Sequence, residues 1–180
     1  MFGLFRRRSP NRPLIERLHG EIMAGARQPL FYVEYGVADT VEGRFELLCL
    51  LASTALRRIE SLPAPAPEIA QEVTDAVFAH FDVALREIGV GDLTVPKKMK
   101  KMAQGWLGRG VAYREALAAG DEAALARAVA RNVYGDEARS GEAPVLRLAR
   151  YALAQDRAFA SLRVEDLGRA PLTFIDPARV

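Results

Sequence analysis

The stretch that decides the fold is residues 39–60, DTVEGRFELLCLLASTALRRIE. Apolar residues recur in it every three or four positions, which is the spacing of one face of an α-helix. Further leucines widen this face until the middle of the stretch is apolar almost all round, although the run is too short for a transmembrane helix. We therefore predict an all-α, single-domain multi-helix bundle with a long central helix. The expected inward residues are Val41, Phe45, Leu48, Ala52, Ala55 and Ile59, with Leu47, Leu50, Leu51 and Leu56 beside them.

Polar residues mark the start of this central helix. Asp39 is a residue type that caps helix N-termini, because its carboxylate accepts a hydrogen bond from an unpaired backbone N–H. Glu42 follows three positions later, so the pair matches a capping box. We predict a helix that is capped by Asp39 and runs to about Glu60.

Helical patterns also cover the rest of the chain, and the alternation typical of strands is almost absent. The segment LPAPAP, residues 62–67, ends the central helix and starts the next, because proline fixes the backbone and lacks a donor. Gly89 and Gly91 suit the end of that next helix, and Thr94 suits the cap of the one that follows. Further helices are expected from Pro13 to about Ala24 and over 68–88, 95–119, 121–132 and 143–161.

The composition is that of a soluble globular protein. Half of the 180 residues are hydrophobic and 27% are charged, which is ordinary for this class and too polar for a membrane bundle. The single cysteine, Cys49, excludes an intramolecular disulfide and every multi-cysteine metal site, and it fits a reducing compartment. The composition thus favours a cytoplasmic protein.

The first twelve residues differ from the rest in charge. They contain four arginines and no acid, whereas the formal net charge of the whole chain is only +2. We expect residues 1–12 to form a basic N-terminal arm and residues 13–180 to form one helical domain. The arm is not a secretory signal, because its short apolar stretch precedes the arginines. Its phenylalanines and arginines suit peripheral contact with an anionic membrane surface, and a solvated terminus is the alternative.

The residues that commonly carry out catalysis form no recognisable catalytic pattern. His19 and His80 are the only histidines, and each lies on or beside an apolar helical row, so core positions are expected for both. We do not expect them to share a pocket with Cys49. The acids Glu34, Asp39, Glu42 and Glu46 are explained by capping and by solvent exposure. We therefore predict no enzyme, no cofactor and no metal site.

The lysines are the exception to an ordinary charge pattern. All four of them, Lys97, Lys98, Lys100 and Lys101, lie within five residues, while the other basic residues are all arginine. They also open a predicted helix, where the helix dipole disfavours cations. We interpret this basic patch as a binding site for a negatively charged partner: RNA, an anionic lipid surface or an acidic protein. A solvated helix face is the alternative.

Four motifs together resemble the ubiquinol-cytochrome c chaperone family. They are FYVEYGVADTVEGRFELLCLL (31–51), LREIGVGDLTVPKKMKKMAQGWLGRGVAY (85–113), ARNVYG (130–135) and LARYAL (148–153). The resemblance implies a helical, non-catalytic assembly factor that binds newly made cytochrome b and assists biogenesis of the ubiquinol-cytochrome c reductase. It also implies that the chaperone acts near the ribosome exit, with the ribosome or a small partner protein as a partner. The compact chain looks like a bacterial member of the family. A ribosome- or RNA-binding adaptor that uses the lysines is the alternative function.

The first motif also suggests where a client binds. Its aromatic residues have large apolar faces with polar tips, which suits transient contact with an apolar helix. Packing of these aromatic residues in the core is the alternative. The candidate client-binding residues are Tyr32, Tyr35, Asp39, Arg44 and Phe45.

Overall fold

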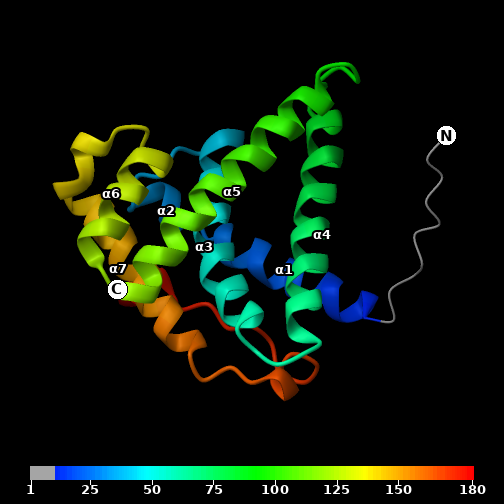
Figure 1. The fold of residues 1–180 in the computed structure, drawn as a ribbon. Helices are drawn as coiled ribbons and strands as arrows, with labels where there is room; N and C mark the ends of the chain where they lie inside the picture. Colours follow the sequence, from blue (N-terminus) through cyan, green and yellow to red (C-terminus); the bar gives the residue numbers. More distant parts are fainter. Residues whose placement is uncertain (1–10) are drawn as a thin grey trace.

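The predicted central helix is α3 (Val41–Glu60), and it lies in the middle of the molecule (Figure 1). The computed structural model describes residues 11–180. Every residue of α3 from Leu47 to Leu56 is buried, so this part of the helix is covered on all sides. The helices that contact it are α1 (Arg12–Ala26), α4 (Ala66–Glu87), α5 (Val95–Ala119), α6 (Glu122–Val133) and α7 (Ala143–Phe159).

The described part of the chain consists of helices joined by turns, and none of its residues is in a strand. The predicted all-α fold is therefore confirmed, and the ends of the predicted helices differ from the observed ends by at most two residues. Sequence patterns missed four short elements: the helix α2 (Leu30–Val33) and the 3-10 helices η1 (Glu137–Gly141), η2 (Val164–Asp166) and η3 (Pro177–Arg179).

Most of the predicted basic arm lies outside the described residues. Of residues 1–12 the structure describes only Asn11 and Arg12. Arg12 is the first residue of α1 and forms an ion pair with Glu16, at 2.7 Å between Nε and Oε1. The helical part of the chain therefore begins one residue earlier than predicted.

The start of α3 differs from the prediction in one respect. Thr40, rather than Asp39, is the N-cap, and its Oγ1 accepts a hydrogen bond from the backbone N–H of Gly43 at 3.1 Å. Asp39 instead accepts a hydrogen bond from Nε of Arg44 at 2.6 Å. Both residue types cap helices, and the extended backbone of Thr40 decides between them. The prediction that Asp39 caps the helix was wrong by one position.

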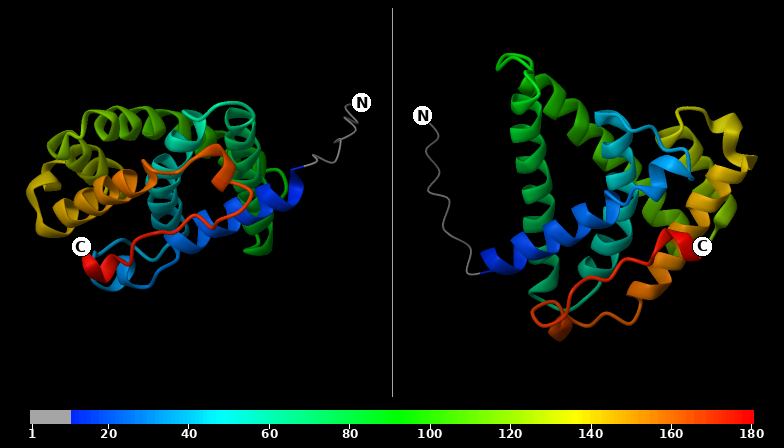
Figure 2. Two further views of the ribbon diagram at one scale, coloured as in Figure 1. Left: turned by 90° about the horizontal axis from the view of Figure 1, so that it is seen from below. Right: turned by 180° about the vertical axis from the view of Figure 1, so that it is seen from behind.

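Two layers of helices flank α3. Helices α1 and α4 pack against each other on one side, and α5, α6 and α7 cover the other (Figures 1 and 2). The connection between α4 and α5 projects from the end of the molecule in Figure 1 and in the right view of Figure 2. This projecting connection contrasts with the C-terminal tail, which lies along the body.

Hydrogen bonds fasten the C-terminal tail to the helices. The buried side chain of Gln155 accepts a hydrogen bond from the backbone N–H of Ile175 at 2.7 Å. The hydroxyl of Tyr151 donates to the carbonyl of Ile175 at 2.8 Å, and the hydroxyl of Tyr35 donates to that of Pro177 at 2.8 Å. The irregular tail is thus an integral part of the fold.

Gly43 gives a direct test of how the start of α3 is built. A Cβ at this position would lie 2.0 Å from the backbone oxygen of Ala38, so the turn before α3 would have to shift. We expect Gly43→Ala to lower the free energy of unfolding by about 1–3 kcal/mol, as overpacking does elsewhere. Urea denaturation measures this change.

Gly20 supplies the matched control, because it lies in α1 and a Cβ there would meet nothing within 4 Å. Gly20→Ala should raise stability by about 0.5–1 kcal/mol, since alanine favours the helix more than glycine does. Equal effects of the two substitutions would contradict the close contact between Gly43 and Ala38.

Candidate functional site

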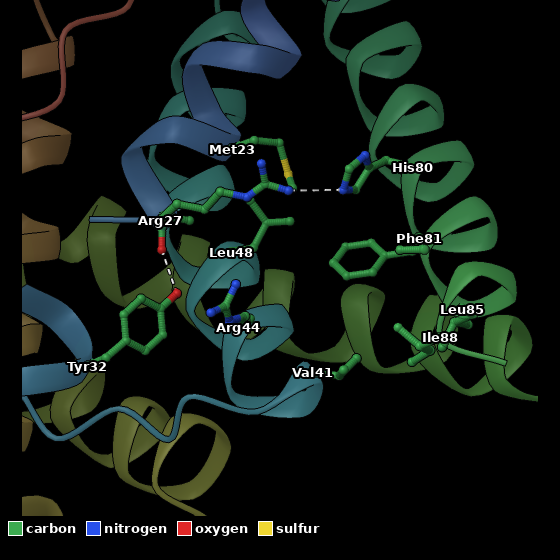
Figure 3. Close-up of a pocket in the computed structure, with 12 residues that line it drawn as sticks. Met23, Arg27, Tyr32, Val41, Arg44, Leu48, His80, Phe81, Leu85 and Ile88 are labelled. Atoms are coloured by element: carbon green, nitrogen blue, oxygen red, sulfur yellow. Dashed lines mark hydrogen bonds between the residues drawn. The ribbon is translucent and has the colours of Figure 1, made fainter. Parts of the chain in front are cut away.

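A groove runs beside the N-terminal half of α3 and consists of two pockets that share Val41 and Leu85. We call it the α3 groove. The first pocket, of about 160 Å³, lies between α1, α3 and α4, and the second, of about 320 Å³, lies between α3, α4 and α5. The first is lined by Met23, Ala26, Arg27, Tyr32, Val41, Arg44, Leu48, His80, Phe81, Ala84, Leu85 and Ile88 (Figure 3). The second is lined by Val41, Glu42, Phe45, Glu46, Leu85, Lys98, Lys101, Met102 and Arg109.

The floor of the groove is apolar because the inward rows of three helices meet there. Leu48 of α3 and Leu85 of α4 are almost fully buried, and the rings of Phe45 and Phe81 pack edge to face with centroids 5.2 Å apart. The rim remains open to water: Val41 is 40% exposed and Ile88 is 59% exposed. The groove therefore offers an accessible apolar surface on a rigid floor.

Arginines border the first pocket. Arg27 extends from α1 toward α4, where its Nη2 lies 3.3 Å from Nε2 of His80 (Figure 3). Arg44 lies over the ring of Tyr32, 5.6 Å from its centroid, and its hydrogen bond to Asp39 lowers the pKa of that carboxyl group. Because Arg44 and Asp39 are more than half exposed, their ion pair adds little stability and can open for a ligand.

The structure divides the five predicted client-binding residues into two groups. Tyr32 and Arg44 line the first pocket, and Asp39 is paired with Arg44, so a client-binding role of these three residues stays a prediction. Phe45 is 5% exposed and forms part of the floor of the second pocket. Tyr35 is fully buried, with the guanidinium carbon of Arg147 4.2 Å from its ring centroid. Tyr35 is therefore a core residue, and the prediction that it lies on an accessible surface was wrong.

Tyr35 is buried because the chain folds back directly after α2. Gly36 has a φ of +69°, a conformation that favours glycine, and it turns the segment that follows toward α3. The turn directs Tyr35 into a cluster with Phe31 and Tyr151, with ring centroids at 5.3 and 6.4 Å. A buried tyrosine next to such a turn cannot be told from an exposed one by sequence period alone.

The four lysines lie together on the first two turns of α5, and all are exposed. Lys98 and Lys101 line the second pocket, so the basic patch and the groove meet. Thr94 precedes the helix as predicted, but its side chain makes no capping hydrogen bond. This helix start therefore combines four cations with an uncapped end, an arrangement that a helix alone would not favour.

Comparison with known proteins identifies the fold. A model of the ubiquinol-cytochrome C chaperone family matches residues 33–174. The chain belongs to this family. A solved structure with the same fold is that of the Cbp3 homolog from Brucella abortus, with a TM-score of 0.83 and 35% sequence identity over 94% of this chain and 93% of that one. A search among curated proteins gave no match. The family that the motifs resemble is thus confirmed.

A buried ion pair in this chaperone was missed from the sequence. Arg109 and Glu46 are in contact at the floor of the second pocket, where their side chains are 25% and 13% exposed. Burial raises the pKa of Glu46, and Arg109 opposes this shift. A signal was present, since Arg109 lies on the same helical row of α5 as Trp106 and Tyr113, two residues that pack in or against the core. An arginine on a row of core residues needs a carboxylate beside it, because an unpaired buried charge is costly.

The two histidines form a pair that the sequence did not predict. His19 of α1 and His80 of α4 face each other with ring centroids 5.5 Å apart. Sequence period places each on an apolar row but does not give the register between two packed helices. Cys49 is buried elsewhere, beside Glu46, and burial raises the pKa of its thiol. Within residues 11–180, no three His, Cys, Asp or Glu side chains are placed to hold a metal ion.

The histidine pair makes the stability of the chaperone depend on pH. Burial lowers the pKa of both imidazoles below the ordinary value of 6.5, and Arg27 lowers both further. The unfolded chain therefore takes up protons at a higher pH than the folded chain does. The free energy of unfolding that depends on keeping both imidazoles neutral is fully present above about pH 6.5. It is lost as the pH falls below this value and through the two folded-state pKa values.

We expect His80→Gln to reduce this loss, because it removes one imidazole and one charge facing His19. The thermal midpoint of the variant should fall less than that of the original protein when the pH is lowered from about 7 to about 5. Thermal denaturation followed by circular dichroism measures both curves. Parallel curves would show that the pair does not control acid sensitivity.

Proposed function

We propose that this chain is a non-catalytic chaperone that binds newly made cytochrome b in the α3 groove and assists biogenesis of the ubiquinol-cytochrome c reductase. The proposal extends the family assignment to a specific client and a specific surface. It places the protein in the cytoplasm, with peripheral contact at the inner membrane. It leaves room for a small partner protein or the ribosome at other surfaces.

The observation that carries this proposal is the open apolar groove. A membrane subunit exposes apolar helix faces before insertion, and an apolar groove between helices is a common receptor for such a face. Val41 and Ile88 on the rim are accessible, while Leu48 and Phe81 form a floor that is already packed. Binding would cover rim side chains without unfolding the domain.

The charges around the groove favour a client segment with acidic or polar ends. Its lining contains five basic side chains and two acidic ones, and one of these acids, Glu46, is paired with Arg109. An apolar segment that ends in a carboxylate would therefore match both the floor and the rim. The other groups lining the groove suggest holding rather than chemistry, because they form no arrangement of nucleophile and base.

Val41→Asp tests the groove without weakening the fold. Val41 is the first residue of α3 and lines both pockets, so the substitution places a carboxylate in the apolar surface. An acid in the first turn of a helix is favoured by about 0.3–1 kcal/mol, so the thermal midpoint should stay the same or rise. We expect about 10-fold less cytochrome b to co-purify with the variant, because a buried unpaired carboxylate is costly.

The control is Val33→Asp, because Val33 is 80% exposed on α2 and lines neither pocket. Each variant is expressed in a strain that lacks the gene, and reductase activity is measured in its membranes. Normal reductase activity in the deletion strain would refute the proposed function. A deletion defect that Val41→Asp rescues fully would instead place the client outside the α3 groove.

A further inference from the structure

The connection between α4 and α5 exposes an apolar side chain at the end of the molecule. Leu93 is 90% exposed, the highest exposure among the large apolar residues of the described chain, and Ile88 across the loop is 59% exposed. The connection projects beyond the helices that cover α3 (Figure 1). We call residues 88–101 the α4–α5 tip. A leucine side chain that is exposed to water in a loop does not stabilise the fold of its own chain.

The same tip carries all the lysines of the chain. Lys97, Lys98, Lys100 and Lys101 lie four to eight residues after Leu93 and are exposed, and none forms an ion pair with a carboxylate of residues 11–180. All four lysines are exposed, whereas Val95 of the same helix is buried and Trp106 packs against the core. Leu93 and the four cations are therefore exposed together within residues 93–101.

Acidic residues near the tip do not cancel this charge. Residues 82–101 contain five basic and three acidic side chains. Two of the acids, Asp82 and Asp92, are paired with Arg86, at 2.9 and 2.5 Å. Glu87 is the third, and it is the last residue of α4. Glu42 of α3 lines the second pocket with Lys98 and Lys101, whereas Lys97 and Lys100 line neither pocket of the α3 groove. The outer surface of the tip is thus basic.

We infer that the α4–α5 tip docks the protein on an anionic lipid bilayer, with Leu93 entering the interface and the lysines contacting lipid headgroups. An exposed apolar side chain followed by a cluster of basic residues is a combination that peripheral proteins use at membranes, because each signal alone is weak. A convex tip suits the surface of a bilayer, whereas the concave α3 groove suits a helix. RNA would attract the lysines but would gain nothing from Leu93.

This inference goes beyond the proposed function, because it concerns a different ligand and a different surface. It also relates the two surfaces, since Ile88, Lys98 and Lys101 line the groove and belong to the tip. Docking by the tip would hold the open groove next to the bilayer. Its test needs only the purified full chain and lipid, so it can fail while client binding stands.

The experiment measures co-sedimentation of the protein with vesicles of phosphatidylcholine, with and without phosphatidylglycerol. We expect binding only to the anionic vesicles, and release when ionic strength rises and the Debye length falls from about 30 Å to about 8 Å. Leu93→Ser should weaken binding about 10-fold, since it removes one leucine from the interface. Replacing the four lysines by glutamine should weaken it about 100-fold or more.

Two control variants separate the tip from general effects of charge and apolarity. Glutamine replaces four exposed arginines elsewhere, at Arg127, Arg157, Arg169 and Arg179, which lowers the net charge by the same four units. Val33→Ser removes an 80% exposed apolar side chain from α2. Both controls should bind anionic vesicles as the original protein does.

The thermal midpoint shows whether each variant is folded. Leu93→Ser changes a side chain with almost no contacts, and removing cations from the start of α5 should keep or raise the midpoint. The inference is refuted if the original protein does not bind anionic vesicles, or if the tip variants bind as well as the controls. It is also refuted if Leu93→Ser has no effect and RNA displaces the lipid, which would make the lysines a nucleic-acid site.

Discussion

The whole structure depends on burying one helix from every side. From Leu47 to Leu56 every residue of α3 is buried, and five other helices pack around it. Burial on this scale also encloses two polar side chains, Ser53 and Thr54. Their hydroxyls donate to backbone carbonyls of the same helix, at 2.7 Å each, so the core contains no unpaired hydroxyl at these positions. The fold thus follows from a single helix whose middle is apolar on all sides.

The first turns of α3 are the part that this packing does not close. There the helix presents Val41 and Arg44 to the α3 groove, whose lining comes from α1, α3, α4 and α5. The difference between the sealed middle and the open end is already present in the sequence, where glycine and charged residues give way to leucines. In the function that we propose, this division lets a rigid core support a surface that stays available to a client.

The sequence was sufficient for the helices and the family but not for the details of the site. Helical period predicted each long helix, and four motifs pointed to the family that the comparison confirmed. The helical period of the apolar residues does not distinguish Asp39 from Thr40 as the N-cap, because both residue types cap helices. It could not bring His19 to His80 either, because the register between packed helices depends on side chains from both. The burial of Tyr35 depends on the turn at Gly36, and the geometry of this turn is seen only in the three-dimensional structure.

The tail that lies along the body has a consequence for how the chain is made. Arg17 of α1 donates to the backbone carbonyls of Leu167 and Ala170, and Glu21 accepts from the backbone N–H of Leu172 at 2.9 Å. The first helix therefore obtains these partners only after residues 167–172 have been synthesised. Until then Arg17 and Glu21 remain solvated, although α2 to α7 have already been made. The docking of α1 onto the tail is thus a late step in the folding of a newly made chain.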